Sequence, residues 1–263
     1  MSCSQQGRAL VPRLLLQLQQ GHACGAHKLW PGQLAALSTQ GAARFKDSFL
    51  SPPASLEFDR GRVRYPPQLE GNPLGRGLLR LIGAYGQKQQ LANGAAILYN
   101  AITEQAEDKR LHEAFGLDPD AFMSTHHLLS VHVWLVVNRL KAEDRAKAAP
   151  FQQALYSDHF YKDTERRVYR EVTVHVGKWL KKLEQHTYSY WVAYDQAVAG
   201  DRGWSGLADA LVKNVYGGDL TMRPSAALLS KYLNRELACL ELTPVDALYR
   251  GHIKFSTDIK VTG

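Results

Sequence analysis

The chain has 263 residues, a formal net charge of +7 and a hydrophobic content of 45%. That length accommodates a targeting segment and one domain with a sizeable core. Residues 1–46 contain five basic side chains and no acidic one, so the other 27 basic residues face 25 acidic residues and leave a charge of only +2. This near-neutral balance argues against a folded domain that binds nucleic acid through its overall charge.

Residues 1–46 are predicted to be a mitochondrial transit peptide. The segment contains arginine, lacks acidic residues and has a short apolar stretch around residues 10–18. Pro12 and Arg13 interrupt that stretch, which argues against a secretory signal, and the scarcity of serine favours a mitochondrion over a chloroplast. A disordered tail without a targeting role is the alternative interpretation.

The three cysteines are distributed unevenly, because Cys3 and Cys24 lie in the segment that processing would remove. Only Cys239 would remain, so the mature chain can hold neither an intramolecular disulfide nor a metal site built from cysteines. We expect Cys239 to be a core residue of its helix.

Residues 47–77 are rich in proline and glycine, which interrupt both helical and strand periodicity. We expect a linker or an extended arm that can wrap the domain surface or a partner. Beyond it, apolar residues recur at helical spacing, with an expected break at Ala149-Pro150 and a kink or close packing at Gly177. The predicted helices cover 78–82, 91–102, 111–115, 118–141, 160–199, 204–215, 224–240 and 244–250.

The segment between Asp120 and Arg139 carries no charged side chain when histidine is counted as neutral. It contains too many serine, threonine, asparagine and histidine residues for a membrane span, where unpaired polar groups are costly. A buried helix of a soluble bundle fits better, with Asp118 as its N-cap and Pro119 at its first position. Its inward face follows steps of four and three residues: Phe122, His126, Leu129, Val133, Val136 and Leu140.

The fold class that these elements predict is all-α: a single helical-bundle domain with an extended N-terminal arm and a short extended C-terminal tail. Residues 252–255 and 259–261 alternate in polarity like a strand, which predicts the extended tail. The domain is expected to cover residues 78–255, and the tail residues 256–263.

Patterns that carry catalytic chemistry are missing from the sequence. It has no glycine-rich phosphate loop, no GxSxG motif and no pair of aspartates at i and i+4. His126, His127 and His132 are separated by one, five and six residues, so they do not converge on one helix face as metal ligands must. We therefore predict no catalytic residue, no metal and no cofactor. We expect the three histidines to be buried and hydrogen-bonded within the core; the alternative is that they contact a partner or a haem-bearing client.

Two groups of side chains are candidates for binding. A basic run is either an ordinary solvated helix face or a surface that contacts phosphates of the ribosome; its residues are Arg166, Arg170, Lys178, Lys181 and Lys182. Aromatic residues are either core or a groove that holds an apolar segment of a client or partner; they are Trp134, Trp179, Tyr188, Trp191 and Tyr194.

Four blocks of the sequence, in this order, resemble one known family. They are THHLLSVHVWLVVNRLK at 125–141, VGKWLKK at 176–182, AYDQAV at 193–198 and LADALVKNVYG at 207–217. Together with apolar positions farther along, they resemble the ubiquinol–cytochrome c chaperone family, the assembly factors for cytochrome b of respiratory complex III, over about residues 78–255. The chain departs from the family where Tyr188-Ser-Tyr-Trp191 replaces a stretch that often contains glycine.

The resemblance implies a non-enzymatic helical chaperone of the mitochondrial matrix, peripheral to the inner membrane and without a transmembrane span. It implies a small helical partner protein, a position near the mitoribosome exit and newly made cytochrome b as the client. Two alternatives stay open: an RNA- or mitoribosome-binding translation factor, and a helical-bundle enzyme with an unrecognised site.

Overall fold

The computed structural model describes residues 44–61, 67–81, 83–200 and 203–261, and most of the predicted transit peptide lies outside these ranges. The described residues form an all-α helical bundle, as predicted. η2 is a π-helix and η3 a 3₁₀ helix. The helices are α3 (Pro67–Glu70), α4 (Pro73–Leu81), α5 (Gln87–Ala106), α6 (Lys109–Ala114), α7 (Phe122–Leu140), α8 (Arg145–Gln153), η2 (Ala154–Phe160), α9 (Tyr161–Glu171), α10 (Val176–Ala199), α11 (Gly203–Asn214), η3 (Leu220–Met222), α12 (Arg223–Leu242) and α13 (Val245–Arg250).

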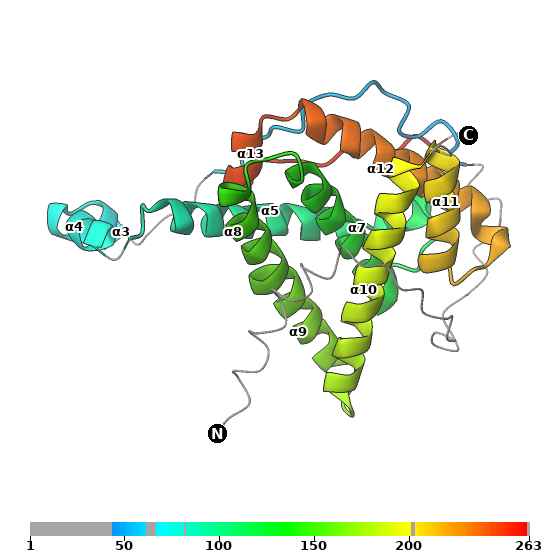
Figure 1. Ribbon diagram of the computed structural model, residues 1–263, viewed down its shortest axis with the longest axis horizontal. Coiled ribbons are helices and arrows are strands. Elements are labelled where there is room, and N and C mark those ends of the chain that lie inside the picture. The colour runs from blue at the N-terminus through cyan, green and yellow to red at the C-terminus, as the bar shows by residue number, and fades with distance from the viewer. Residues whose placement is uncertain (1–43, 62–66, 82, 201–202, 262–263) are drawn as a thin grey trace. The chain divides into compact units, whose positions relative to one another are not determined.

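Helix α7 lies in the middle of the bundle, packed against α5, η2, α10 and α12 (Figure 1). Every residue from His126 to Val136 is buried, which confirms the prediction of a buried helix. In the ranges that the structure covers, no helix is long and apolar enough to cross a membrane. The predicted start of this helix at Asp118 was wrong by a few residues, since the N-cap of α7 is Ala121. The Asp118 carboxylate instead accepts the backbone N–H of Asp120 at 2.9 Å and forms a turn before the helix.

Two predicted interruptions of helices, at Pro150 and at Gly177, are wrong. Pro150 does not break the chain but lies inside α8, where burial of the neighbouring Phe151 and Leu155 offsets the one backbone hydrogen bond that proline removes. Gly177 does not kink a single long helix. The predicted region 160–199 is instead divided between α9 and α10, and the chain turns between them through His175, which has a left-handed φ of 56°.

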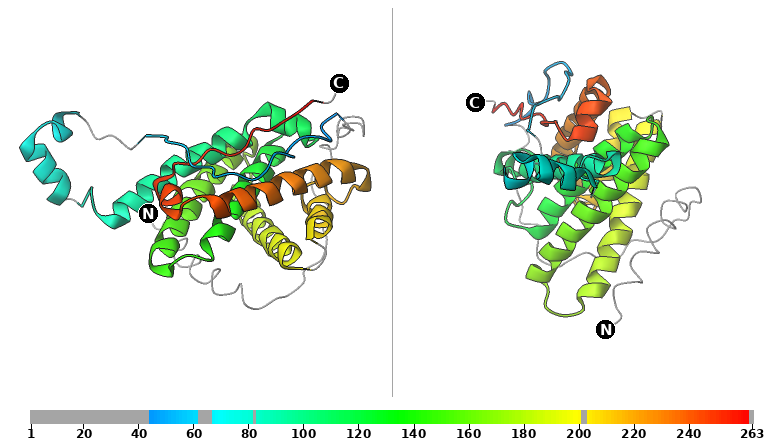
Figure 2. Two further views of the ribbon diagram at one scale, coloured as in Figure 1. Left: turned by 90° about the horizontal axis from the view of Figure 1, so that it is seen from above. Right: turned by 90° about the vertical axis from the view of Figure 1, so that its left-hand side faces the viewer.

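Residues 47–61 of the predicted arm lie beside the C-terminal segment (Figure 2). Residues 67–77, also predicted as linker, instead form α3 and the start of α4. The N–H of Phe49 donates to the carbonyl of Asp258 at 3.0 Å, and the N–H of Lys254 donates to the carbonyl of Leu56 at 3.0 Å. The side chains of Phe49 and Leu56 are buried in the main core, and so is that of Phe45, which lies within the predicted transit peptide. This part of the chain is therefore packed structure rather than a free linker.

Arg235 and Glu236 of α12 join the arm to the tail. The Arg235 guanidinium donates to the carbonyl and the hydroxyl of Ser51 at 3.0 and 2.8 Å, and it also donates to the hydroxyl of Ser256. Glu236, which is completely buried, accepts the N–H of Ser256 at 3.2 Å and pairs with Arg235 at 3.1 Å. Burial raises the pKa of Glu236, and the hydrogen bonds from Ser256 and Arg235 act against that shift.

The three histidines of α7 are buried, as predicted, and have different partners. His132 is within hydrogen-bond distance of the carbonyl of Leu128 and the hydroxyl of Tyr232, both at 2.7 Å. His126 lies 3.3 Å from the hydroxyl of Thr187, whereas Nε2 of His127 has no hydrogen-bond partner among the residues described. Burial lowers the pKa of His126 to about 3 and those of His127 and His132 to about 4. All three rings are therefore neutral near pH 7.

Helix α5 crosses the end of α13 at two glycines. A β-carbon on Gly94 would lie 1.8 Å from the carbonyl oxygen of Tyr249, and one on Gly251 would lie 2.4 Å from the carbonyl oxygen of Gly94. Gly251 also has a φ of 73°, which ends α13 as predicted. The close approach of the two backbones requires glycine at both positions.

We predict that Gly94→Ala destabilises the fold by about 2 kcal/mol, because a methyl group at the crossing forces the two backbones apart. Equilibrium unfolding in urea measures this change. The matched control is Gly177→Ala, since a β-carbon there meets nothing within 4 Å, and it should stabilise the helix by up to about 1 kcal/mol. Equal stability of the two variants would contradict the close crossing.

We also predict that the fold loses stability as the pH falls from about 6.5 to about 4. The pKa values of the three buried histidines are lowered in the folded state, so only the unfolded chain takes up protons in this window, and no loss occurs above it. Each ring costs about 1.4 kcal/mol by pH 5.5. His127→Phe should make the pH dependence of urea unfolding shallower; a wild-type stability that does not change between pH 7 and pH 5 would refute the prediction.

Candidate client-binding surface

Two of the five predicted client-binding aromatics lie inside the fold. Trp134 and Tyr194 are buried between α7 and α10 with ring centroids 5.5 Å apart. The indole N–H of Trp134 donates to the carboxylate of Asp195 at 3.0 Å, which also accepts from Asn138 at 3.2 Å and pairs with Lys141 at 2.6 Å. These contacts position α10 on α7 and leave neither ring at the surface.

The other three aromatics are half-buried and do not form one groove. The indole N–H of Trp191 donates to the hydroxyl of Ser130 at 3.0 Å, and its ring packs against Tyr156 and Phe160. Trp179 lies closer to the N-terminal end of α10, under the ammonium group of Lys182 at 5.3 Å from the ring centroid. Tyr188 lies between them along the helix.

Trp179 belongs to a second apolar cluster, separate from the main core. Its buried members are Val168, Leu180 and Leu183. Phe122, Met123, Val172, Val176 and Trp179 pack against them and keep part of their surface in water. We call these eight residues the hairpin cluster, because the turn between α9 and α10 brings most of them together.

Two large apolar side chains beside the hairpin cluster are exposed. Tyr169 is 60% exposed and Val174 is 66% exposed, and they lie at the end of α9 and in the turn that follows. The sequence did not single out either residue, because the expectation of one long helix concealed the turn. Together with the half-buried members of the cluster, they give the α9–α10 turn an accessible apolar surface.

The predicted basic residues flank this surface on both helices. Arg166 and Arg170 are exposed on α9, Lys178 and Lys181 are exposed on α10, and Lys182 covers Trp179. Acidic residues lie among them, and burial raises the pKa of one of these, Glu184. The surface is therefore apolar at its centre and mixed in charge, with more cations than anions, around it.

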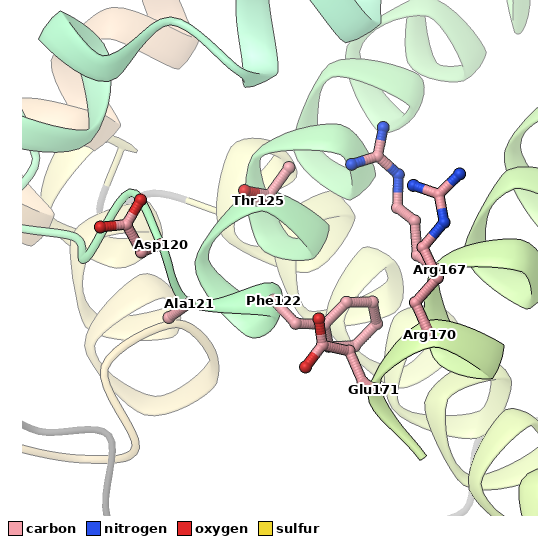
Figure 3. Close-up of a pocket in the computed structure, with 7 residues that line it drawn as sticks. All are labelled: Asp120, Ala121, Phe122, Thr125, Arg167, Arg170 and Glu171. Atoms are coloured by element: carbon pink, nitrogen blue, oxygen red, sulfur yellow. The ribbon is translucent and has the colours of Figure 1, made fainter. Parts of the chain in front are cut away.

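A small cavity of about 170 Å³ adjoins the hairpin cluster at Phe122 (Figure 3). Residues 120–122 and Thr125 line one side, and Arg167, Arg170 and Glu171 of α9 line the other. Arg167 is held in place by Glu107 at 2.6 Å and Asp163 at 2.7 Å. The cavity therefore places charges of both signs around the aromatic ring of Phe122.

Comparison with known proteins identifies the family of the chain. Residues 113–255 match the model of a family described as ubiquinol-cytochrome C chaperone. The chain is also similar to the crystal structure of the Cbp3 homolog from Brucella abortus, with a TM-score of 0.58 and 28% identity, over 70% of this chain and 99% of that one. No curated protein sequence matches the chain. The family match spans more than half of the sequence and all of the hairpin cluster, and the chain therefore belongs to the ubiquinol-cytochrome c chaperone family.

Proposed function

We propose that this protein is a non-enzymatic assembly chaperone that receives newly synthesised cytochrome b of respiratory complex III. It acts in the mitochondrial matrix, peripheral to the inner membrane, together with a small helical partner. The observation that carries the proposal is the accessible apolar surface at the α9–α10 turn, because it lies within the residues that match the chaperone family.

The chemistry of such a client explains the arrangement. A newly made membrane protein exposes apolar segments that lose contact with water only when another apolar surface covers them. In the hairpin cluster, Trp179 and Val176 offer partly exposed apolar area, and Tyr169 and Val174 extend it. Because few charged groups lie at its centre, the surface can cover different apolar segments without requiring one sequence.

The predicted aromatic residues have two separate roles in this proposal. Trp179, Tyr188 and Trp191 are half-buried and remain candidate contacts for the client or the partner. Trp134 and Tyr194 are buried and support binding only by positioning α10. Replacing either of these two would test the fold rather than the binding surface.

We predict that Tyr169→Ser combined with Val174→Ser reduces capture of newly synthesised cytochrome b about tenfold, because both substitutions remove exposed apolar contact area. Chemical cross-linking after labelling of mitochondrial translation measures the capture. The control is Leu220→Ser, another exposed apolar residue on a different element. Equal capture by both variants would place the client elsewhere.

The basic residues around the turn support a second candidate function, contact with the mitoribosome as a translation factor or at the exit site. Arg166, Arg170, Lys178 and Lys181 are exposed on two adjacent helices and are suited to contacting phosphates. This function does not exclude a chaperone role, since a client is received where it is made.

We predict that the combined variant R166A/R170A/K181A/K182A binds mitoribosomes more weakly than wild type and with a smaller dependence on salt, because each lost phosphate contact lowers that dependence by about 0.9 in log–log slope. Cosedimentation over a range of salt concentrations measures both quantities. R145A/K147A, which removes two exposed cations of α8, should leave both unchanged. An unaltered slope in the first variant would rule out direct phosphate contact.

A further inference from the structure

Helix α4 presents three leucines to solvent on one face. Leu74, Leu78 and Leu81 follow the spacing i, i+4 and i+7, which places them in one line along the helix. They are 83%, 49% and 85% exposed, and Leu74 and Leu81 are the most exposed large apolar residues of the part of the chain that the structure describes. A line of exposed leucines on a short helix requires a covering partner.

A second face of α4 explains why the leucines point outward. Gly75 and Leu79 are buried, and α4 packs against α3. A β-carbon on Gly75 would lie 2.4 Å from the carbonyl oxygen of Leu69, so glycine is what allows the two helices to approach. The adjacent α3 and α4 are visible in Figure 2. The contact with α3 fixes the rotation of α4 and leaves its leucine face free.

The third face is basic. Arg76 and Arg80 are exposed one turn apart, and neither forms an ion pair with any described residue. The sequence from Gly71 to Thr103 contains no acidic residue. The charges on α4 itself are therefore both positive, with Glu70 of α3 as the one acidic side chain of this helix pair, and this balance is complementary to an anionic partner.

We infer that α4 binds the surface of a bilayer that contains anionic lipids, with the three leucines inserted at the level of the headgroups. A short amphipathic helix that is basic on its polar face is the form that lies in the membrane interface. A protein groove is less suitable, because three leucines provide much less than the roughly 800 Å² per partner that a stable protein interface buries. A single short helix binds a bilayer weakly, so the attachment is reversible.

This inference rests on the proposed location beside the inner membrane and specifies the element that makes the contact. It concerns lipid alone and needs neither the client nor the ribosome. Failure of lipid binding by the purified protein would therefore leave client capture untouched, and failure of client capture would leave lipid binding untouched.

The first test uses a fluorescent reporter on the full chain. An environment-sensitive NBD group is attached to L74C in a C3S/C24S background, where the remaining native cysteine, Cys239, is buried. Vesicles of phosphatidylcholine with 30 mol% cardiolipin should shift its emission to the blue and raise its intensity about twofold or more, as expected for a probe that leaves water. The same probe on L242C, an exposed position of α12, should not respond. Because the probe reports only on its own position, the signal distinguishes vesicle binding through α4 from binding through the basic N-terminal segment, which can also attract anionic vesicles.

The second test uses variants in vesicle flotation. L74S/L78S/L81S should reduce recovery with the cardiolipin vesicles, whereas L220S should not. R76Q/R80Q should reduce the partition coefficient about tenfold or more on cardiolipin vesicles and have little effect on pure phosphatidylcholine. An unresponsive L74C probe would overturn the inference. So would a probe signal that rises with protein concentration without lipid, because that result would indicate a second copy of the chain as the occupant.

Discussion

The arrangement of the bundle depends on the burial of α7. Its apolar side chains contact helices on several sides, so those helices remove nearly the whole segment from water at once. The polar groups of the segment must then find partners inside the protein. The hydroxyl of Tyr232 on α12 is one such partner. It lies within hydrogen-bond distance of His132 at 2.7 Å and accepts from the side-chain amide of Gln105 on α5 at 3.2 Å. One tyrosine therefore links the central helix α7 to two of its neighbours, α5 and α12.

The accessible surface at the α9–α10 turn is a consequence of this arrangement. Main-core packing ends on α10 near Tyr190, and the residues before it contact only α9 and the start of α7. A cluster of three buried residues cannot cover all the apolar side chains around it. The α9–α10 turn thus contributes little to the main core and keeps apolar side chains in contact with water.

The fold class could be predicted from the sequence because helical spacing and the uncharged segment between Asp120 and Arg139 are local signals. The packing of Gly94 on Tyr249 could not, since it depends on two positions that approach only in three dimensions. Pro150 and Gly177 were misinterpreted for a related reason: tertiary packing outweighs the preference of a single residue. Of the residues predicted to bind, the basic ones and three of the aromatic ones are at least partly exposed, but the sequence could not divide the aromatic residues into inner and outer ones. Trp134 and Trp191 look alike in sequence, and their burial is decided by the crossing of α7 and α10.

The pairing of arm and tail bears on the order in which the protein can fold. Among the described residues the arm is synthesised first, yet its hydrogen-bond partners, such as Asp258 and Lys254, belong to the segment that is synthesised last. Phe49, which packs on Phe115 and Tyr232, cannot be covered in the core until α12 has been synthesised and packed. A partly synthesised chain therefore carries exposed apolar surface of its own, and the described fold forms only after residues 253–260 have paired with the arm.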